Sequence, residues 1–273
     1  MPELPEVETI RRELEPLISG KIFVRPVLHM PSTIESPSVE EFSTTLTGRT
    51  IENLTRRGKY LIINLDRGIL VVHLRMTGNL SYSVNGQPRE ERFLRVSLPF
   101  TDESALHYFD MRRFGRLWLV ANREELHTKV LKRVGPDILE EVDLEKFLKL
   151  LGKRQRSKIK ALLLDQGFAA GMGNIYTDEC LHRCNIHPRR QAGSLSRTET
   201  EELYAAIKAV LADGIEYGGT TFRDYRNTSG AIGSFQSKLA VYGCKGEKCR
   251  CGAKIEKITE AGRGTYYCPN CQK

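Results

Sequence analysis

The chain contains 273 residues, which is long enough for two modest hydrophobic cores and a small appendage. Lys and Arg outnumber Asp and Glu by 42 to 34, and the formal net charge of +8 favours a polyanionic partner such as nucleic acid or an anionic membrane surface. No apolar run approaches the ~20 residues that span a bilayer, and the first residues lack the basic leader and apolar core of a secretory signal. We therefore expect a cytoplasmic protein that does not bind or span a membrane.

A helix followed by a series of strands is predicted for the first 120 residues. Residues 5–18 carry apolar side chains at the three-to-four spacing of a helix with one buried face, and Pro5 suits its first turn. Between about residues 20 and 120 the pattern changes to short apolar and β-branched runs, separated by turn signals such as DRG, TGN and NGQP. This pattern predicts a sandwich of antiparallel strands, which we assign to a domain over residues 1–135.

The second half of the chain has a helical composition. It begins after the VGPDIL segment at residues 134–139, where Gly and Pro mark a domain boundary. We predict a helical domain over residues 136–237 and a Cys-rich domain over residues 238–273, so the fold class is α+β. Residues 218–235 are rich in Gly, Ser and Thr, which is typical of a mobile loop.

The first residues of the chain offer an unusual nucleophile. Removal of Met1 would leave Pro2 with a free secondary amine, and α-amino groups have pKa values near ~7.7–8.0. Glu3 is covalently adjacent and can move protons, and Glu6 follows one helical turn later. The alternative is that PELPE is only a helix start, with stabilising acids in its first turn.

The exact amino-terminal string decides between these interpretations. MPELPEVET resembles the signature of the formamidopyrimidine-DNA glycosylases, the bacterial 8-oxoguanine glycosylases, whereas the related endonuclease VIII family has Gly in place of Leu4. The resemblance continues in family order through RRGKY, HLRMTG, RRFG, LLLDQ, GMGNIY, GGTT and AGRGTYYCPNC. It implies that Pro2 is a Schiff-base nucleophile, that Glu3 helps to open the sugar, and that Lys59 serves base release and β-elimination. From the residues alone, Lys59 could instead lie in a solvated basic turn.

A second group of residues is predicted to fill the space left by an extruded base. Met76 falls at a strand end before a Thr-Gly-Asn turn, and Phe114 lies in the segment RRFGR, where burial explains it poorly because unpaired arginines are rarely buried. The resemblance implies that Met76, Arg112 and Phe114 form an intercalating triad in which Arg112 faces the orphaned cytosine. We also expect His73 to contact DNA, whereas Phe93 stands where the family usually has a DNA-contacting histidine.

A basic segment opens the predicted helix–two-turn–helix motif. Five cations without an acid lie between residues 153 and 160, which is typical either of a solvated helix face or of a DNA-binding surface. The glycine-rich turn that follows leads to a helix beginning at Asn174, where backbone N–H groups suit an anion. The resemblance implies that Lys160 and Asn174 clamp phosphates, and we include Arg156 among the predicted DNA contacts.

The end of the chain predicts a structural zinc site. Five of the seven Cys residues lie in the last thirty, and Cys251 followed by the Cys268–Cys271 pair has zinc-ribbon spacing. The fourth ligand could be Cys249, which is separated from Cys251 by only one residue, or Cys244. The intervening segment predicts a hairpin with AGRG at its tip, and the resemblance implies that Arg263 acts in DNA binding and δ-elimination.

Taken together, these expectations predict a bifunctional glycosylase and abasic-site lyase that binds one Zn²⁺. We expect it to act as a monomer on double-stranded DNA that contains an oxidised purine. Two alternatives remain open at this point. The first is an endonuclease VIII-type activity on oxidised pyrimidines, and the second is a zinc-dependent DNA-binding protein without catalysis.

Overall fold

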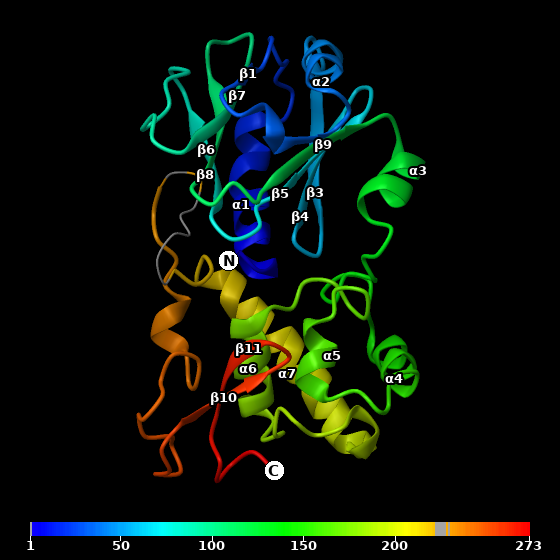
Figure 1. Cartoon of the computed structure of the whole chain (residues 1–273), viewed down its shortest axis with the longest axis vertical. Helices are drawn as coiled ribbons and strands as arrows, with labels where there is room; N and C mark the ends of the chain where they lie inside the picture. The colour runs from blue at the N-terminus through cyan, green and yellow to red at the C-terminus, as the bar shows by residue number, and fades with distance from the viewer. Residues whose placement is uncertain (1, 222–227, 229) are drawn as a thin grey trace. The chain divides into compact units, whose positions relative to one another are not determined.

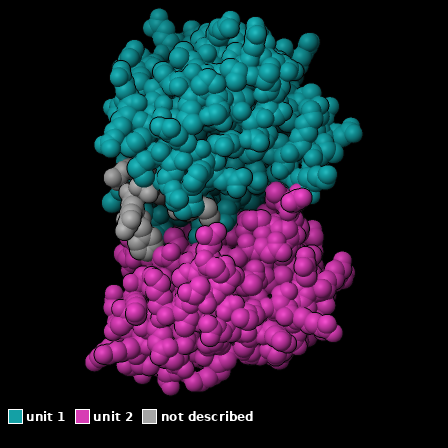
Figure 2. Space-filling model, viewed as in Figure 1, with its two compact units in different colours: residues 1–132, 217–234 teal, residues 133–216, 235–273 magenta. Residues whose placement is uncertain are grey.

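The computed structural model of the chain describes residues 2–221, 228 and 230–273. The described residues form two compact units, coloured separately in Figure 2. The first unit comprises residues 1–132 and 217–234, and the second comprises residues 133–216 and 235–273. No helix in the described ranges is long and apolar enough to cross a membrane.

Two sheets make up most of the first unit. The four-stranded sheet has the order β1 (Val27–Leu28), β7 (Leu94–Pro99), β8 (Ala105–Asp110) and β6 (Gly78–Ser83). The five-stranded sheet has the order β2 (Ile34–Ser36), β9 (Arg116–Val120), β5 (Ile69–His73), β4 (Tyr60–Leu65) and β3 (Ile51–Arg57). All neighbouring strands are antiparallel except β2 and β9, which pair in parallel. The predicted sandwich is therefore confirmed, with one parallel pair at its edge.

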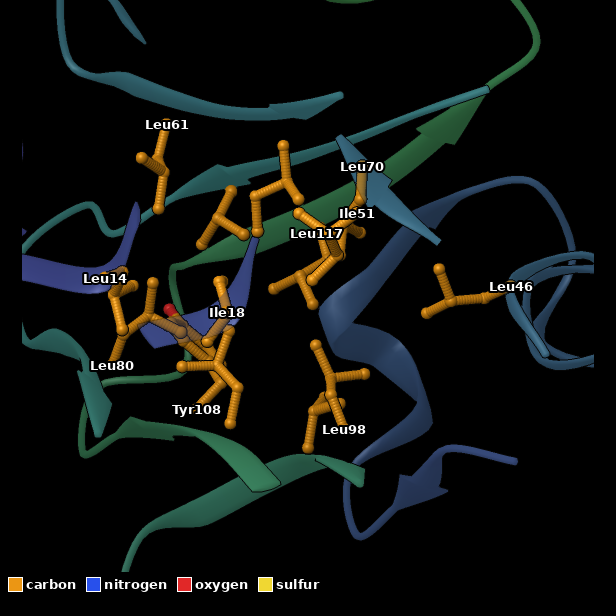
Figure 3. Packing of buried hydrophobic residues seen from close by; sticks show 14 of the residues in the cluster. Leu14, Ile18, Leu46, Ile51, Leu61, Leu70, Leu80, Leu98, Tyr108 and Leu117 are labelled. Atoms are coloured by element: carbon orange, nitrogen blue, oxygen red, sulfur yellow. The ribbon is translucent and has the colours of Figure 1, made fainter. Parts of the chain in front are cut away.

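The leading helix α1 (Leu4–Ile18) completes the core of this unit. Its apolar positions Ile10, Leu14 and Ile18 have no exposed surface and join one cluster with side chains of both sheets. Figure 3 shows this packing, in which leucines from the strands surround Leu14, Ile18 and Tyr108. Burial of the apolar face of α1 is what holds the amino end of the chain against the sheets.

Short helical elements lie between β1 and β3 and after β9, the last strand of the first unit. They are η1 (Pro31–Thr33), α2 (Val39–Leu46), α3 (Arg123–Glu125) and a π-helical turn, η2 (Leu126–Val130).

The second unit is helical and ends in a hairpin. Figure 1 shows its helices α4 (Leu144–Gly152), α5 (Ile159–Leu164), α6 (Asn174–Arg183) and α7 (Arg197–Glu216). The short helix η3 (Ala192–Ser194) lies between α6 and α7, and η4 (Phe235–Lys238) lies between α7 and the hairpin. The hairpin strands β10 (Glu256–Glu260) and β11 (Arg263–Tyr267) pair antiparallel, and β11 packs on α6. The α+β architecture predicted from the sequence is therefore confirmed.

Residues 217–234 belong with the sandwich, although the sequence pattern assigned them to the helical domain. The backbone N–H of Thr220 donates to Glu6 Oε1 at 2.7 Å, and the N–H of Thr228 donates to Glu13 Oε2 at 3.0 Å. Both acceptors lie on α1. Contacts between residues more than 200 positions apart leave no local signal, so composition could not assign this segment to its unit. Residues 222–227 and 229 of the predicted loop lie outside the described residues.

Candidate functional site

The start of α1 holds Pro2 and Glu3 in a buried position. Glu3 is the N-cap residue and is 2% exposed, and its backbone N–H donates to Glu6 Oε2 at 2.7 Å. The second oxygen of Glu6 accepts the N–H of Thr220, so one carboxylate fixes both the helix start and the segment that returns to it. The N-terminal end of a helix carries a partial positive charge, which disfavours protonation of an amine placed beside it.

Gly219 allows this close approach. Its φ of +84° lies in the left-handed region, and a Cβ at this position would meet Glu6 Cγ at 2.8 Å. A side chain at residue 219 would therefore push the segment away from α1.

Lys59 lies in the turn between β3 and β4, beside a buried ion pair. The Arg56 guanidinium donates to Gly58 O at 3.0 Å, and Gly58 has a positive φ that shapes the turn. Arg56 Nε also bonds Glu8 Oε2 at 3.2 Å, which anchors the turn to α1. Lys59 itself is only 7% exposed, and its charge is close enough to lower the pKa of His73. The turn thus brings an ammonium group to the end of strands β3 and β4.

His73 is a buried neutral group. Burial, together with the charges of Arg75 and Lys59, lowers its pKa to about 3. Its ring packs edge-on against Tyr60, with 4.4 Å between ring centroids, and its Nδ1 accepts the N–H of Arg75 at 3.1 Å. In a neutral imidazole that accepts at Nδ1, Nε2 carries the hydrogen. His73 therefore supports the turn that leads to Met76, and a contact from it to a phosphate would be a neutral N–H bond.

Asp110, which the sequence analysis did not single out, organises the segment that carries Arg112 and Phe114. This carboxylate is 1% exposed and accepts the N–H of Arg112 at 3.2 Å and the N–H of Gly115 at 2.8 Å. It also accepts the Thr77 hydroxyl, and Thr77 in turn accepts the N–H of Arg112 at 2.9 Å. The turn after β5 and the loop after β8 are therefore tied together by one buried acid.

The tip of this loop exposes apolar surface beside cations. Phe114 is 49% exposed and Met111 is 45% exposed, whereas Met76 is half-buried. The Arg112 guanidinium lies over the Phe114 ring, 4.9 Å from its centroid. An exposed ring covered by a planar cation presents a flat surface on which a base can stack.

In the second unit, Asn174 and Arg263 lie on adjoining elements. Asn174 is the first residue of α6 and its Nδ2 donates to Gly264 O at 2.8 Å. Asn174 Oδ1 is buried and has no hydrogen-bond partner among the described residues. Arg263 is exposed and follows the turn at Ala261 and Gly262, so it stands at the tip of the hairpin as the spacing predicted.

Lys160 does not lie where a phosphate clamp would. Its side chain has no exposed surface, and its Nζ pairs with Asp178 Oδ1 at 2.6 Å. Asp178 Oδ2 accepts the N–H of Tyr266, so the pair joins α5, α6 and β11. A phosphate contact by Lys160 would require this pair to open, and its position does not support the predicted clamp. Charge spacing alone could not reveal the acid, because Asp178 lies on the next helix.

Arg156 is exposed, in contrast to Lys160. It lies in the turn between α4 and α5. Residues 152–157, which include Lys153 and Arg154, line a surface hollow of about 540 Å³. This turn is the part of the predicted basic segment that remains open to a ligand.

Four thiols converge at the end of the chain. The sulfur atoms of Cys249, Cys251, Cys268 and Cys271 all lie within 4.8 Å of one another. The Cys249–Cys271 and Cys251–Cys268 distances are 3.8 and 3.5 Å, and a tetrahedron with Zn–S bonds of about 2.3 Å has sulfur–sulfur edges of about 3.8 Å. The donor set therefore fits one structural Zn²⁺. Cys244 is not part of the cluster, and its Sγ instead faces Tyr242 O at 3.7 Å.

Comparisons with known proteins agree with this architecture. Family models match as "Formamidopyrimidine-DNA glycosylase N-terminal domain" over residues 1–117, as "Formamidopyrimidine-DNA glycosylase H2TH domain" over residues 134–226, and as "Zinc finger found in FPG and IleRS" over residues 246–273. A formamidopyrimidine-DNA glycosylase of Pelotomaculum thermopropionicum is 46% identical over 275 residues, covering 100% of this chain and 99% of the relative. The Geobacillus kaustophilus protein of the same name is 45% identical over 275 residues, with 100% of both chains covered.

Solved structures extend the likeness to three dimensions. A point mutant of the Lactococcus lactis FPG in complex with a Fapy-dG containing DNA has a TM-score of 0.91 and 40% identity over all of both chains. The Lactococcus lactis Fpg in complex with an abasic site containing DNA has a TM-score of 0.90 and 40% identity, also over all of both chains. The matches cover the sandwich, the helical motif and the zinc finger together, and the chain therefore belongs to the formamidopyrimidine-DNA glycosylase family.

Proposed function

We propose that the chain is a bifunctional DNA glycosylase and abasic-site lyase that removes 8-oxoguanine and formamidopyrimidines from duplex DNA. The observation that carries the proposal is the start of α1, where Pro2 directly precedes a buried Glu3 that Glu6 holds in place. A helix start alone would not need proline before a buried acid. The relatives of known structure are named as complexes with Fapy-dG and abasic-site DNA, which are a substrate and a reaction intermediate of such an enzyme.

The first chemical step uses the amine that removal of Met1 exposes. The Pro2 nitrogen bonds to C1′ of the damaged nucleotide while the bond from C1′ to the base breaks, and the base leaves with the electron pair and takes up a proton. Glu3 gives a proton to the ring oxygen as the sugar opens. The nitrogen loses its own proton and forms an iminium with C1′, which retains a positive charge.

The iminium then makes strand scission easy because it accepts electrons. Removal of a C2′ proton expels the 3′ phosphate, and removal of a C4′ proton expels the 5′ phosphate. We assign Lys59 to proton transfer in base release and in the first elimination, and Arg263 to the second. The burial of Lys59 beside strand ends suits an ammonium that must exchange protons at a fixed position.

Extrusion of the base requires that its place in the duplex be filled. The exposed Phe114 ring and the Arg112 guanidinium above it supply an apolar wedge with hydrogen-bond donors, and Met76 lies in the turn between β5 and β6. We assign Arg112 to the base opposite the lesion, because its planar donors can reach a base edge that has lost its partner. The segment 218–235 is assigned to closing over the extruded base.

The remaining contacts hold the phosphate backbone. We assign phosphate contacts to Asn174, Arg156 and His73, with Asn174 at the N-terminal end of a helix where anions are favoured. Zn²⁺ would be held by Cys249, Cys251, Cys268 and Cys271, and it supplies a structural crosslink that fixes the hairpin carrying Arg263. The enzyme is proposed to act as a monomer.

Reduction with borohydride tests the covalent step directly. The wild-type enzyme, incubated with a duplex containing 8-oxoguanine opposite cytosine, should yield a stable protein–DNA adduct, because borohydride reduces the iminium to an amine. Pro2→Gly should form the adduct far more slowly. The absence of an adduct with the wild type, or an equal rate with Pro2→Gly, would rule out the mechanism. Intact-mass measurement of the purified protein must first show that Met1 has been removed.

Two further duplexes separate the alternatives. Faster cleavage of thymine glycol than of 8-oxoguanine would favour an endonuclease VIII-type enzyme. Tight binding of a tetrahydrofuran abasic analogue without any cleavage of 8-oxoguanine would favour a non-catalytic DNA-binding protein.

A further inference from the structure

One face of α6 holds the zinc finger through a row of polar side chains. Asn174 donates to Gly264 O, and Asp178 accepts the N–H of Tyr266 at 2.9 Å. Glu179 accepts three successive backbone N–H groups at 2.8–3.0 Å. These donors belong to Ala240, Val241 and Tyr242. Side chains four residues apart lie one above another on a helix, so the row continues from residues 174 and 178 to residue 182.

His182 continues this row at the metal site itself. Its Nε2 lies 3.4 Å from Cys249 Sγ, and the two side chains are 5% and 7% exposed. A thiolate bound to Zn²⁺ has no hydrogen to give and can only accept. In the zinc-bound protein, therefore, Nε2 carries the hydrogen and donates it to the sulfur.

We propose that His182 is the hydrogen-bond donor to the Cys249 thiolate that retains Zn²⁺ in the finger and locks the finger to α6. It is a positioning residue rather than a metal ligand, because the four thiols already complete the cluster.

The charge of the site explains why such a donor is needed. Zn²⁺ with four thiolates has a net charge of −2, and two of the four sulfurs belong to the buried residues Cys249 and Cys268. A buried anion without a donor loses the stabilisation that water would give it. A hydrogen bond from outside the ligand set offsets this loss and fixes the direction of the sulfur.

The spacing of the first two ligands adds a second reason. Only Arg250 separates Cys249 from Cys251, which is shorter than the two to four residues usual in zinc sites. A turn with fewer residues has fewer backbone N–H groups to offer to its sulfurs. The imidazole of His182 supplies a donor from another element, α6, to the first sulfur of this short turn.

Zinc release from the full-length, zinc-loaded protein tests the proposal without reference to DNA. A chelator with a colorimetric zinc signal should remove Zn²⁺ from His182→Phe roughly 10-fold faster than from the wild type, in line with the usual loss of affinity when such a donor is removed. His182→Gln keeps an N–H donor and should stay close to the wild-type rate. His127→Phe makes the same change at an exposed histidine of the first unit and should have no effect. Equal rates for His182→Phe and the wild type would overturn the proposal, as would a His182→Gln rate equal to that of His182→Phe.

Cobalt substitution supplies a readout that a packing effect would not give. A hydrogen bond lowers the energy of the sulfur lone pairs, so its loss should move the thiolate-to-cobalt charge-transfer bands of His182→Phe to lower energy, with the tetrahedral ligand-field bands kept. His182→Gln should retain the wild-type bands. Should His182→Phe fail to fold, a His182→Gln spectrum shifted from that of the wild type would overturn the assignment on its own. Because both assays report on metal alone, their outcome is independent of the borohydride result for Pro2.

Discussion

Gly115 lies in the loop that carries Arg112 and Phe114, where there is little space around Asp110. A Cβ at this residue would lie 1.6 Å from the Tyr108 hydroxyl and 3.2 Å from Asp110 Oδ2. The backbone N–H of Gly115 already donates to that same carboxylate at 2.8 Å. Glycine is therefore required here by packing, since the loop could not close on Asp110 with any side chain in place.

Gly115→Ala should displace the loop that carries Arg112 and Phe114. Overpacking of this kind costs about 3 kcal/mol when the neighbours cannot move, and Tyr108 has no exposed surface. Urea denaturation should show this loss, and binding to an abasic-site duplex should weaken with it. Gly152→Ala, where a Cβ meets nothing within 4 Å, is the matched control for the stability measurement. Wild-type stability and binding in Gly115→Ala would show that the loop is not held this tightly.

At the residue scale, the sequence predicted side chains whose chemistry lies in a motif and missed those defined by distant partners. The four zinc ligands follow from their spacing, apart from the choice between Cys249 and Cys244. Asp110 carries no comparable signal, because the groups it accepts from come from two separate turns. The sequence gives no signal for the role of His182 either, because its partner Cys249 lies 67 positions away.

At the scale of elements, Glu8 ties the leading helix to the sheet. It accepts from Arg11 at 2.9 Å and from Arg12 at 2.7 Å on its own helix, and from Arg56 of β3 at 3.2 Å. Burial raises the pKa of Glu8, but the hydrogen bonds from Arg11 and Arg12 and the charges of Arg11 and Arg56 outweigh it and hold the pKa at about 2. A depressed carboxyl pKa contributes stability above its unfolded value of 4.5, and this contribution is lost as the pH falls toward 2.

Glu8→Gln should therefore lower stability at neutral pH more than in acid. The shift corresponds to about 2 kcal/mol after solvent screening is discounted. Urea unfolding at pH 7 should show this loss relative to the wild type, and the difference should narrow at pH 3.5, where part of the wild-type contribution has already gone. Glu90→Gln, at an exposed loop acid, should change stability little at either pH. A difference that stays constant with pH would indicate lost packing instead of lost charge.

Elements with strong periodicity were predictable, and those defined by pairing were not. The leading helix, the strands of the sandwich and the terminal hairpin follow from side-chain patterns that repeat within each segment. The parallel pairing of β2 with β9 joins segments far apart in the chain, as the pair Ile34–Leu117 shows. The position of Lys160 was missed for the same reason, since its burial depends on an acid from α6.

At the scale of the whole molecule, the sandwich and the zinc finger differ in what holds each of them together. The sandwich has one large apolar core that includes α1 and both sheets. The zinc finger has a small cluster in which Val241 and Ile255 are joined by Cys249 and Cys268. So few apolar side chains do not stabilise a fold without a crosslink, and the metal supplies it.

Removal of Zn²⁺ should therefore unfold one part of the molecule and spare another. After treatment with a strong chelator, hydrogen–deuterium exchange should become fast across β10 and β11, because the four cysteines would no longer be crosslinked and the hairpin would lose its base. Exchange should also rise in α6, whose Asp178 and Glu179 carboxylates would lose their backbone donors in the finger. Protection of β4 and β5 should remain unchanged, because their core contains no group that depends on the metal. Restoration of protection by added Zn²⁺ is the control, and loss of protection in β4 and β5 would show that the sandwich does not fold independently of the metal.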